Sequence, residues 1–300
     1  KSGKYQDDRL HNAQEYYYAL MRAFGRIAGA DKKGVFDPVI EFFAGGLGMR
    51  PPATISENRR NMFARRAGDS CDSLIKFATE YAPNVFPREL RDPAFLRRTK
   101  EELVECARYF DDASAYAMTR PEFVAMTHVN LQIDNGFFWR TASGELEAGL
   151  LDWYNFTRSP FAAIYMGCLS GAEPSVLSAH LEGFMRCFAT EYEQAGGPSI
   201  DPVELLLMFK LMYVSTIING LQFIESDIKQ EGPPSHEWKT IMSKEDPRVM
   251  GRWNVRCRLI AIIQSLAFWK EENLHTTFMA WVTSGCGEQW KTAGREQLAF

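Results

Sequence analysis

A surplus of positive charge is missing from this sequence. Its 34 lysine and arginine residues are outnumbered by 38 aspartate and glutamate residues, which leaves a formal net charge of −4. Because proteins bind DNA and RNA largely by neutralising phosphates with basic side chains, the composition argues against a nucleic-acid partner. Basic pairs such as Arg59-Arg60 and Arg97-Arg98 lie in helical patterns. They are better interpreted as solvated helix faces than as sites for a polyanion or an acidic partner.

The chain also lacks cysteines at the spacing of a metal site. It contains no Cys-x-x-Cys pair, and no histidine cluster accompanies its cysteines, so neither a zinc site nor a disulfide framework is indicated. Buried free thiols fit better, and they predict an intracellular protein in a reducing compartment, either the cytoplasm or an organelle. The six cysteines lie in long apolar stretches: Cys71, Cys106, Cys168, Cys187, Cys257 and Cys286.

One apolar run, from Leu205 to Ile224, approaches the length of a membrane span. It contains Lys210, Asn219 and Gln222, and it follows the helix-starting turn Asp201-Pro202. Polar side chains inside a lipid-facing helix are costly. We therefore interpret the run as a buried core helix and expect no membrane span.

Most of the sequence has the spacing of amphipathic helices. Apolar side chains recur at helical intervals over residues 10–29. Asp37 and Pro38 are a typical cap and first helical residue, and they predict a helix up to about Gly45. Later helices are expected over 174–195, 201–229, 252–271 and 273–284.

Two further helices are expected from their capping residues. Ser70 and Asp92 are residues whose side chains can accept hydrogen bonds from the first free backbone N–H groups of a helix, so each is expected to be a cap. The helix capped by Ser70 is predicted to end at about Tyr81. The helix capped by Asp92 is predicted to end at about Phe110.

Three short apolar and aromatic segments interrupt the helical pattern: Glu122 to Thr127, Gly136 to Arg140 and Leu146 to Trp153. A polar loop at 128–135 and a turn at Ser143-Gly144 separate them, which predicts a small β-hairpin among helices. The expected fold class is α+β, mainly α. A single domain is predicted over residues 1–300, helical over 1–120, with the loop and hairpin over 121–153, and helical again over 154–300.

The loop and the hairpin carry the most informative residues. Residues 127–135 are Thr-His-Val-Asn-Leu-Gln-Ile-Asp-Asn, and residues 150–153 are Leu-Leu-Asp-Trp. This arrangement resembles the aminoglycoside phosphotransferase and choline/ecdysteroid kinase-like superfamily. The catalytic loop of that family is His-Gly-Asp-x-x-x-x-Asn, followed by a strand, a turn and a strand that ends in Asp-Trp. The positions that match in type and spacing are His128, Asn135, Asp152 and Trp153.

The resemblance extends over roughly residues 10–285 and implies the helical C-terminal lobe of a protein-kinase-like fold. It also implies roles for individual residues. Asn135 and Asp152 would be oxygen ligands that hold Mg²⁺ against the phosphates of ATP. His128 would anchor the loop.

Several departures from the family pattern argue against catalysis. Asn130 occupies the position of the catalytic aspartate, and Val129 replaces the neighbouring glycine. An amide cannot accept the proton of the acceptor hydroxyl, and general-base assistance is typically worth about 10²–10⁴-fold in rate. No acidic residue follows in 159–163, where the family often has one. Nothing before residue 120 has the pattern of the family's N-terminal β-lobe, which is therefore upstream or lost.

Together these departures predict a catalytically degenerate, pseudokinase-like protein. We expect it to bind protein partners, or to be a structural subunit of a larger assembly, without a cofactor. The main alternative is an enzyme that uses ATP and Mg²⁺ to phosphorylate the hydroxyl of a small molecule, with Asn130 orienting the acceptor. An unrelated helical interaction protein is a third interpretation.

Overall fold

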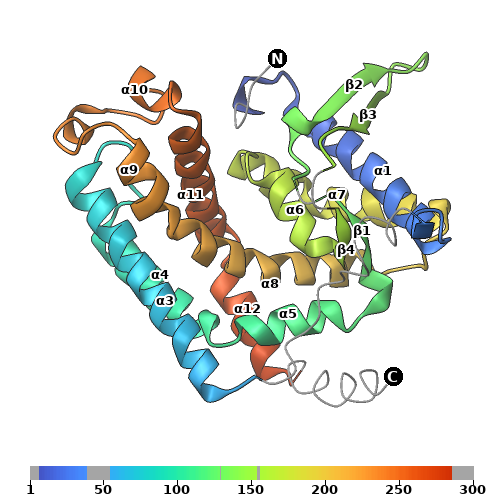
Figure 1. The fold of residues 1–300 in the computed structure, drawn as a ribbon, viewed down its shortest axis with the longest axis horizontal. Coiled ribbons are helices and arrows are strands. Elements are labelled where there is room, and N and C mark those ends of the chain that lie inside the picture. The colour runs from blue at the N-terminus through green and yellow to red at the C-terminus, as the bar shows by residue number, and fades with distance from the viewer. Residues whose placement is uncertain (1–6, 39–54, 129, 154–155, 286–300) are drawn as a thin grey trace. The chain divides into compact units, whose positions relative to one another are not determined.

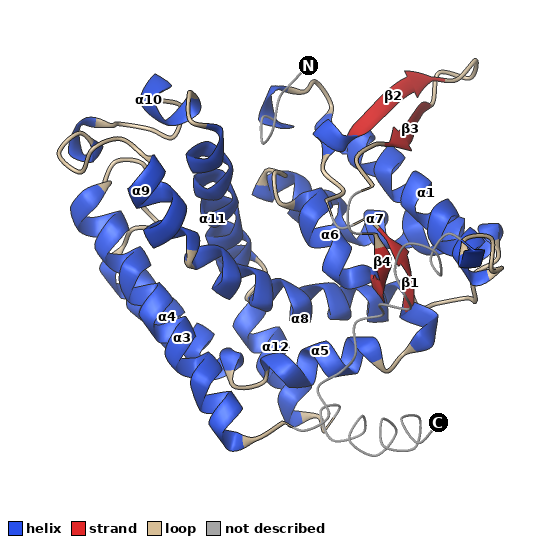
Figure 2. Cartoon of the chain, viewed as in Figure 1, coloured by secondary structure: helices blue, strands red, loops and turns tan. Residues whose placement is uncertain are grey.

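The structure, a computed structural model, describes residues 7–38, 55–128, 130–153 and 156–285 (Figure 1). It is mainly helical, with two small two-stranded antiparallel sheets (Figure 2). This confirms the predicted α+β, mainly α class. The described residues before Val124 contain helices and turns but no strand.

The chain divides into two compact units. The first comprises Lys1–Ala53, Asp112–Met212 and Thr283–Phe300, and the second comprises Thr54–Asp111 and Tyr213–Val282. Helix α8 (Pro202–Leu221) belongs to both units, because its first half lies in one and its second half in the other. The prediction of a single domain over 1–300 stays a prediction.

The first unit contains both sheets. Strands β1 (Val124–Thr127) and β4 (Thr157–Pro160) form one antiparallel pair, and β2 (Gly136–Arg140) and β3 (Leu146–Leu150) form the other. Its helices are α1 (Ala13–Lys32), most of α5 (Phe110–Met118), α6 (Phe161–Leu169) and α7 (Pro174–Ala195), with short 3-10 turns at Asp7–Arg9, Pro121–Phe123 and Ile133–Asn135.

The second unit contains helices joined by turns and loops, with no strand among its described residues. Its longer helices are α3 (Glu57–Lys76), α4 (Pro93–Ala107), α11 (Trp253–Glu271) and α12 (Leu274–Thr283). Shorter helical segments are Phe77–Tyr81, Ile224–Ile228, α9 (Lys229–Glu231), Trp238–Thr240 and α10 (Pro247–Met250).

The helix predictions from capping residues have different outcomes. Asp92 caps α4, because its carboxylate accepts hydrogen bonds from the backbone N–H groups of Ala94 (3.0 Å) and Phe95 (2.9 Å). The prediction for Ser70 is wrong: this residue is buried in the middle of α3, on the helix face that packs inward, and Ser56 is the cap. The helix predicted over 36–45 lies mostly outside the described residues.

Three boundaries of predicted elements also differ from those found. The helix capped by Asp92 ends at Ala107 rather than Phe110, which instead begins α5. The first strand begins at Val124, because a 3-10 turn occupies Pro121–Phe123. The third strand ends at Leu150, since the chain leaves the ladder before Asp152.

None of the five cysteines in the described ranges forms a disulfide. Cys71, Cys106, Cys168 and Cys257 are buried. Burial raises the pKa of the Cys71 thiol to about 12, because a thiolate is poorly solvated there. These thiols therefore behave as small apolar groups in the core.

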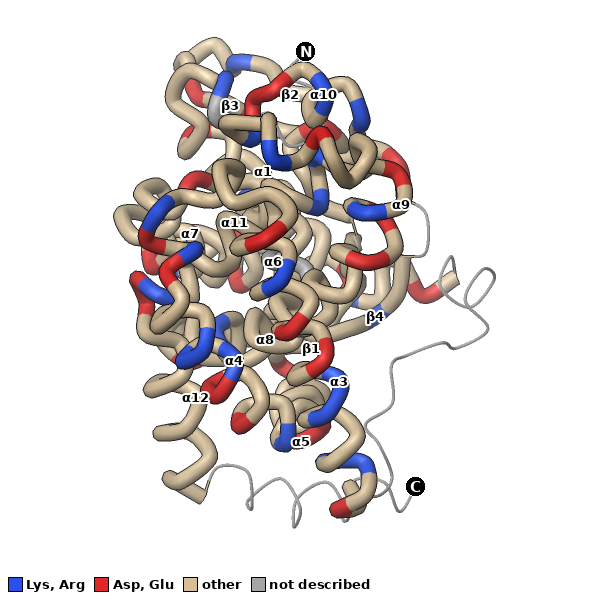
Figure 3. The backbone as a smooth tube through the Cα atoms, turned by 90° about the vertical axis from the view of Figure 1, so that its left-hand side faces the viewer, with Lys and Arg blue, Asp and Glu red and all other residues tan. Residues whose placement is uncertain are grey.

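One arginine of each of the two basic pairs has an acidic neighbour. Arg59 on α3 forms an ion pair with Asp111, and Arg98 on α4 has its Nε 3.6 Å from Oε1 of Glu102. Acidic and basic positions are intermixed along the helices in Figure 3. This arrangement agrees with solvated helix faces, while the absence of a nucleic-acid partner stays a prediction.

One described helical stretch, Pro202–Glu231, is long and apolar enough to cross a membrane by length and composition. Within its most apolar window, 56% of the residues are buried inside the structure, as in the core helices of many soluble proteins. The expectation of no membrane span stays a prediction.

Helices α1 and α7 approach each other closely along two glycines of α1. A Cβ atom at Gly29 would lie 2.5 Å from the carbonyl oxygen of Tyr192 and 2.6 Å from the Cβ of Ala195. A Cβ atom at Gly25 would lie 2.9 Å from the carbonyl oxygen of Phe188. Real Cβ atoms do not come this close to backbone atoms, so both positions need glycine.

We expect Gly29→Ala to lower the free energy of unfolding by about 2 kcal/mol, since the added methyl group forces the helices apart. Urea denaturation measures the change. Gly220→Ala in α8 is the control, because a Cβ there meets nothing within 4 Å, and alanine favours a helix interior by up to about 1 kcal/mol over glycine. A Gly29→Ala protein as stable as the control would contradict the close approach.

Candidate functional site

The predicted site residues lie at the ends of strands in the first unit. β1 pairs with β4 so that Thr127 is opposite Thr157, and β2 pairs with β3 so that Gly136 is opposite Leu150. The loop that begins at His128 follows β1, and Asn135 directly precedes β2. Asp152 follows β3. The two sheets therefore hold both ends of the loop and the end of the hairpin.

His128 joins the loop to the residues after β3. It is 1% exposed, its Nε2 lies 2.6 Å from the carbonyl oxygen of Leu151, and its Nδ1 lies 3.3 Å from the backbone nitrogen of Asn130. A carbonyl only accepts and a backbone N–H only donates, so Nε2 carries the proton and Nδ1 accepts. The ring also packs edge-on against Trp153, with 4.7 Å between ring centroids. These contacts agree with the anchoring role that the resemblance implies.

Asn130 is held through its backbone on both sides. Its N–H donates to His128, and its carbonyl oxygen accepts a 2.7 Å hydrogen bond from Nδ2 of Asn135. The same carbonyl accepts from the backbone N–H of Gln132 at 2.9 Å. Val129, which replaces the family glycine, lies outside the described residues. Hydrogen bonds thus fix the loop on both sides of Asn130.

Asn135 and Asp152 are brought to the same end of the hairpin. The backbone N–H of Leu151 donates to the carbonyl oxygen of Asn135 at 2.8 Å, which places Asp152 one residue from this contact. Asn135 is 8% exposed. Because its Nδ2 is used within the loop, Oδ1 is the atom left to bind a cation. Asp152 is exposed, so its carboxylate faces solvent.

The backbone of Asp152 has an uncommon conformation, with φ of +60°. Residues other than glycine rarely adopt positive φ, and such strain tends to occur at functional sites. An amide oxygen and a carboxylate are suitable ligands for Mg²⁺, which keeps several waters and uses substrate phosphates as well. The described part of the chain contains no group of three or more His, Cys, Asp or Glu side chains that could hold a metal alone.

An ion pair between the buried carboxylate of Asp31 and the half-exposed guanidinium of Arg158 supports β1 and β4 from α1. Both carboxylate oxygens of Asp31 are engaged: Oδ1 accepts from Nη2 of Arg158 at 2.8 Å, and Oδ2 accepts from the backbone N–H of Met126 at 2.7 Å. Asp37 forms a second ion pair with Arg158. The two carboxylates raise the pKa of the Arg158 guanidinium above its usual value. The end of α1 is thereby tied to the sheet from which the loop begins.

Two hydroxyl groups connect β1 and β4 beside the loop, and one of them belongs to Ser159, in the segment where the resembling family often has an acidic residue. Ser159 on β4 is 3% exposed, and its Oγ lies 2.8 Å from Oγ1 of Thr127 on β1. Thr127 Oγ1 also donates to the carbonyl oxygen of Thr157 at 2.9 Å. An uncharged pair of hydroxyl groups, from Thr127 and Ser159, therefore connects β1 and β4 beside the loop.

Sequence reasoning missed Asp31 and Arg158. A signal for Asp31 exists in the spacing of α1: Phe24, Ala28 and Asp31 lie on one helix face, and all three are buried. A carboxylate on the buried face of a helix needs a partner, because an unpaired buried charge is very costly. Nothing in the local sequence identifies Arg158 as that partner.

Comparison with known proteins adds no relative, since no protein-family model, curated protein or solved structure matches the chain. The kinase-like interpretation therefore stays a prediction. It rests on the spacing of four residues, on the hairpin that holds them and on the contacts of the loop. Those residues are His128, Asn135, Asp152 and Trp153.

Proposed function

We propose that this chain is a catalytically degenerate, kinase-like protein that acts as a binding module or a structural subunit. The observation that carries the proposal is Asn130, an amide at the position where the resembling family has its catalytic carboxylate. The loop around it has ordered contacts, since His128 and Asn135 both bond to the backbone of Asn130. We expect an ordered loop that lacks the catalytic base in a protein that uses the kinase-like fold for binding rather than for catalysis.

The chemistry of position 130 supports this conclusion. General-base catalysis needs a group that takes up a proton at neutral pH, and an uncharged amide does not do so. The lost base alone would slow transfer by about 10²–10⁴-fold. Phosphoryl transfer depends mainly on positioning and charge, so this loss is severe but not absolute.

The β2–β3 hairpin offers an apolar surface for a partner. Phe137 and Trp139 are 51% and 46% exposed, and their rings stack with 5.4 Å between centroids on one face of β2. We call Phe137 and Trp139 the hairpin aromatic face. Exposed aromatic side chains are enriched in protein interfaces. β2 also has one edge that pairs with no strand among the described residues.

The experiment replaces the hairpin aromatic face with serine in the double variant Phe137→Ser/Trp139→Ser. Proteins that bind the wild-type chain in an extract of its own source are expected to be lost from the variant, as measured by affinity capture and quantitative mass spectrometry. Met62→Ser is the control, since Met62 is 49% exposed on α3. Retention of the same partners by the double variant would contradict the assignment of this surface.

The alternative function is an ATP- and Mg²⁺-dependent phosphotransferase that acts on a small-molecule hydroxyl. One observation favours it, namely the positive φ of Asp152 beside the hydrogen bond from Leu151 to Asn135. In that case Asn135 and Asp152 would bind Mg²⁺, and Asn130 would orient the acceptor. The two functions predict different results when Mg²⁺ and ATP are added: the phosphotransferase binds them, and the degenerate module does not.

A further inference from the structure

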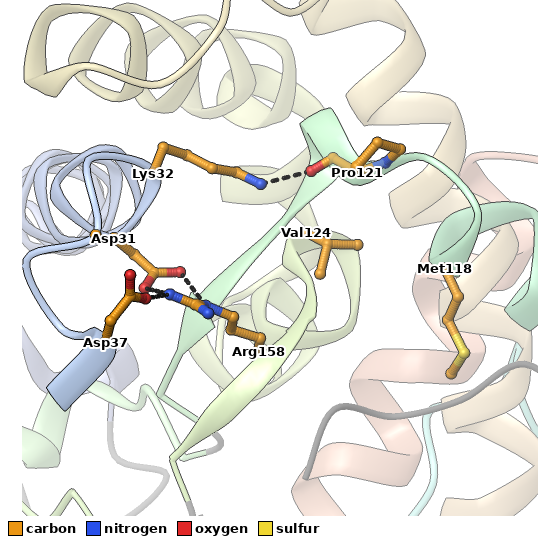
Figure 4. A pocket seen from close by; sticks show the side chains of 8 residues that line it. Asp31, Lys32, Asp37, Met118, Pro121, Val124 and Arg158 are labelled. Atoms are coloured by element: carbon orange, nitrogen blue, oxygen red, sulfur yellow. Dashed lines mark hydrogen bonds and ion pairs between the residues drawn. The ribbon is translucent and has the colours of Figure 1, made fainter. Parts of the chain in front are cut away.

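A pocket of about 410 Å³ lies beside β1 and β4 in the first unit. Lys32 and Asp31 reach it from the end of α1, and Arg158 reaches it from β4 (Figure 4). An apolar side is formed by Met118 and Val124. The full lining is Asp31, Lys32, Gly34, Asp37, Met118, Pro121, Val124 and Arg158. A cavity of this size is typical of small-molecule sites.

The charged groups of the pocket differ in whether they form ion pairs. The Arg158 guanidinium pairs with Asp31 and Asp37, as the dashed lines of Figure 4 show. Lys32 donates one hydrogen bond, of 2.6 Å, to the carbonyl oxygen of Pro121. It forms no salt bridge with any residue that the structure describes. Since an ammonium group has three N–H donors, two remain for another acceptor.

Among the described residues, Pro121 supplies the backbone carbonyl oxygen that accepts from Nζ of Lys32. The nearby carbonyl oxygens of Ala30 and Asp31 accept instead from the backbone N–H groups of Lys33 and Gly34. Burial lowers the pKa of Lys32 because its ammonium group loses water, and the positive charge of Arg158 lowers it further; the charges of Asp31 and Glu122 offset this only in part. An anion beside the ammonium group would restore the lost stabilisation.

We propose that this pocket binds a small organic carboxylate, whose charged end contacts Nζ of Lys32 and whose apolar end packs against Met118 and Val124. A single negative charge suits the lining. Asp31 and Asp37 are nearby, and a doubly charged phosphate would be repelled more strongly by them than a carboxylate. This site is separate from Asn135 and Asp152, so it does not depend on the function proposed above.

Competitive acetylation of lysines, read by mass spectrometry, tests the proposal with hexanoate as the probe. The rate at Lys32 is expected to fall about tenfold when hexanoate is present at ten times its Kd. Lys33, which is exposed and adjacent in the sequence, is the internal control and should keep its rate. Hexanamide, which has the same shape without the charge, should protect neither lysine.

The variants Lys32→Met and Lys33→Met provide a second readout. Hexanoate should raise the Tm of the wild type and of Lys33→Met, and the shift should be lost in Lys32→Met. The proposal is overturned if hexanoate leaves the rate at Lys32 unchanged, or if hexanamide or inorganic phosphate protects Lys32 as well as hexanoate. The labelling experiment uses the wild-type protein, so it tests the proposal even if Lys32→Met does not fold.

Discussion

Asp31→Ala is expected to lower the free energy of unfolding by about 2–3 kcal/mol, because a buried hydrogen-bond acceptor and one partner of a half-buried ion pair are lost together. The side chain of Asp31 is 1% exposed and accepts hydrogen bonds from Arg158 and from the backbone N–H of Met126. Its removal leaves a buried N–H group without a partner and a guanidinium with one carboxylate fewer. Urea denaturation monitored by tryptophan fluorescence measures the loss.

Two further variants separate the contributions at this position. Asp31→Asn keeps an oxygen for Met126 but loses the charge, so its stability should lie between those of the wild type and Asp31→Ala. Asp37→Ala removes the other carboxylate on Arg158, whose side chain is 49% exposed, and should cost less than about 1 kcal/mol. Equal losses for Asp31→Ala and Asp37→Ala would show that burial of Asp31 does not matter.

His128→Ala should cost about 3 kcal/mol, because it removes two hydrogen bonds and a buried ring at once. The carbonyl oxygen of Leu151 and the N–H of Asn130 both lose their partner, and Trp153 loses its ring contact. We also expect faster hydrogen exchange at the Asn130 amide. Urea denaturation and exchange monitored by mass spectrometry measure the two effects.

His275→Ala is the matched control for this change. Its ring contacts Glu105, whose side chain is 52% exposed, at 2.8 Å. Such a surface pair contributes less than about 1 kcal/mol. If His128→Ala were no more harmful than His275→Ala, His128 would not anchor the loop.

Much of the secondary structure could be predicted from the sequence because apolar periodicity is a local signal. The hairpin strand Gly136–Arg140 and the helices at 174–195 and 252–271 agree closely with β2, α7 and α11. The strand β4 was not predicted. Its residues, Thr-Arg-Ser-Pro, have no alternating apolar pattern, and they form a strand through pairing with β1.

The site could be predicted only as spacing along the chain. The positions of His128, Asn135 and Asp152 follow from the motif, but their partners do not. The bond from Asn135 to the carbonyl oxygen of Asn130 and the positive φ of Asp152 depend on how the loop meets the hairpin. For Ser70 the local signal was misleading. Its side chain suits a helix cap, but the residue is buried inside α3.

The most direct test of the central claim is calorimetric titration of the full-length protein with ATP and Mg²⁺ at millimolar concentrations. A degenerate module is expected to give no binding heat above that of dilution. Asp152→Ala should then be indistinguishable from the wild type. Saturable, Mg²⁺-dependent binding to the wild type that Asp152→Ala abolishes would contradict the account and establish a working nucleotide site at Asn135 and Asp152.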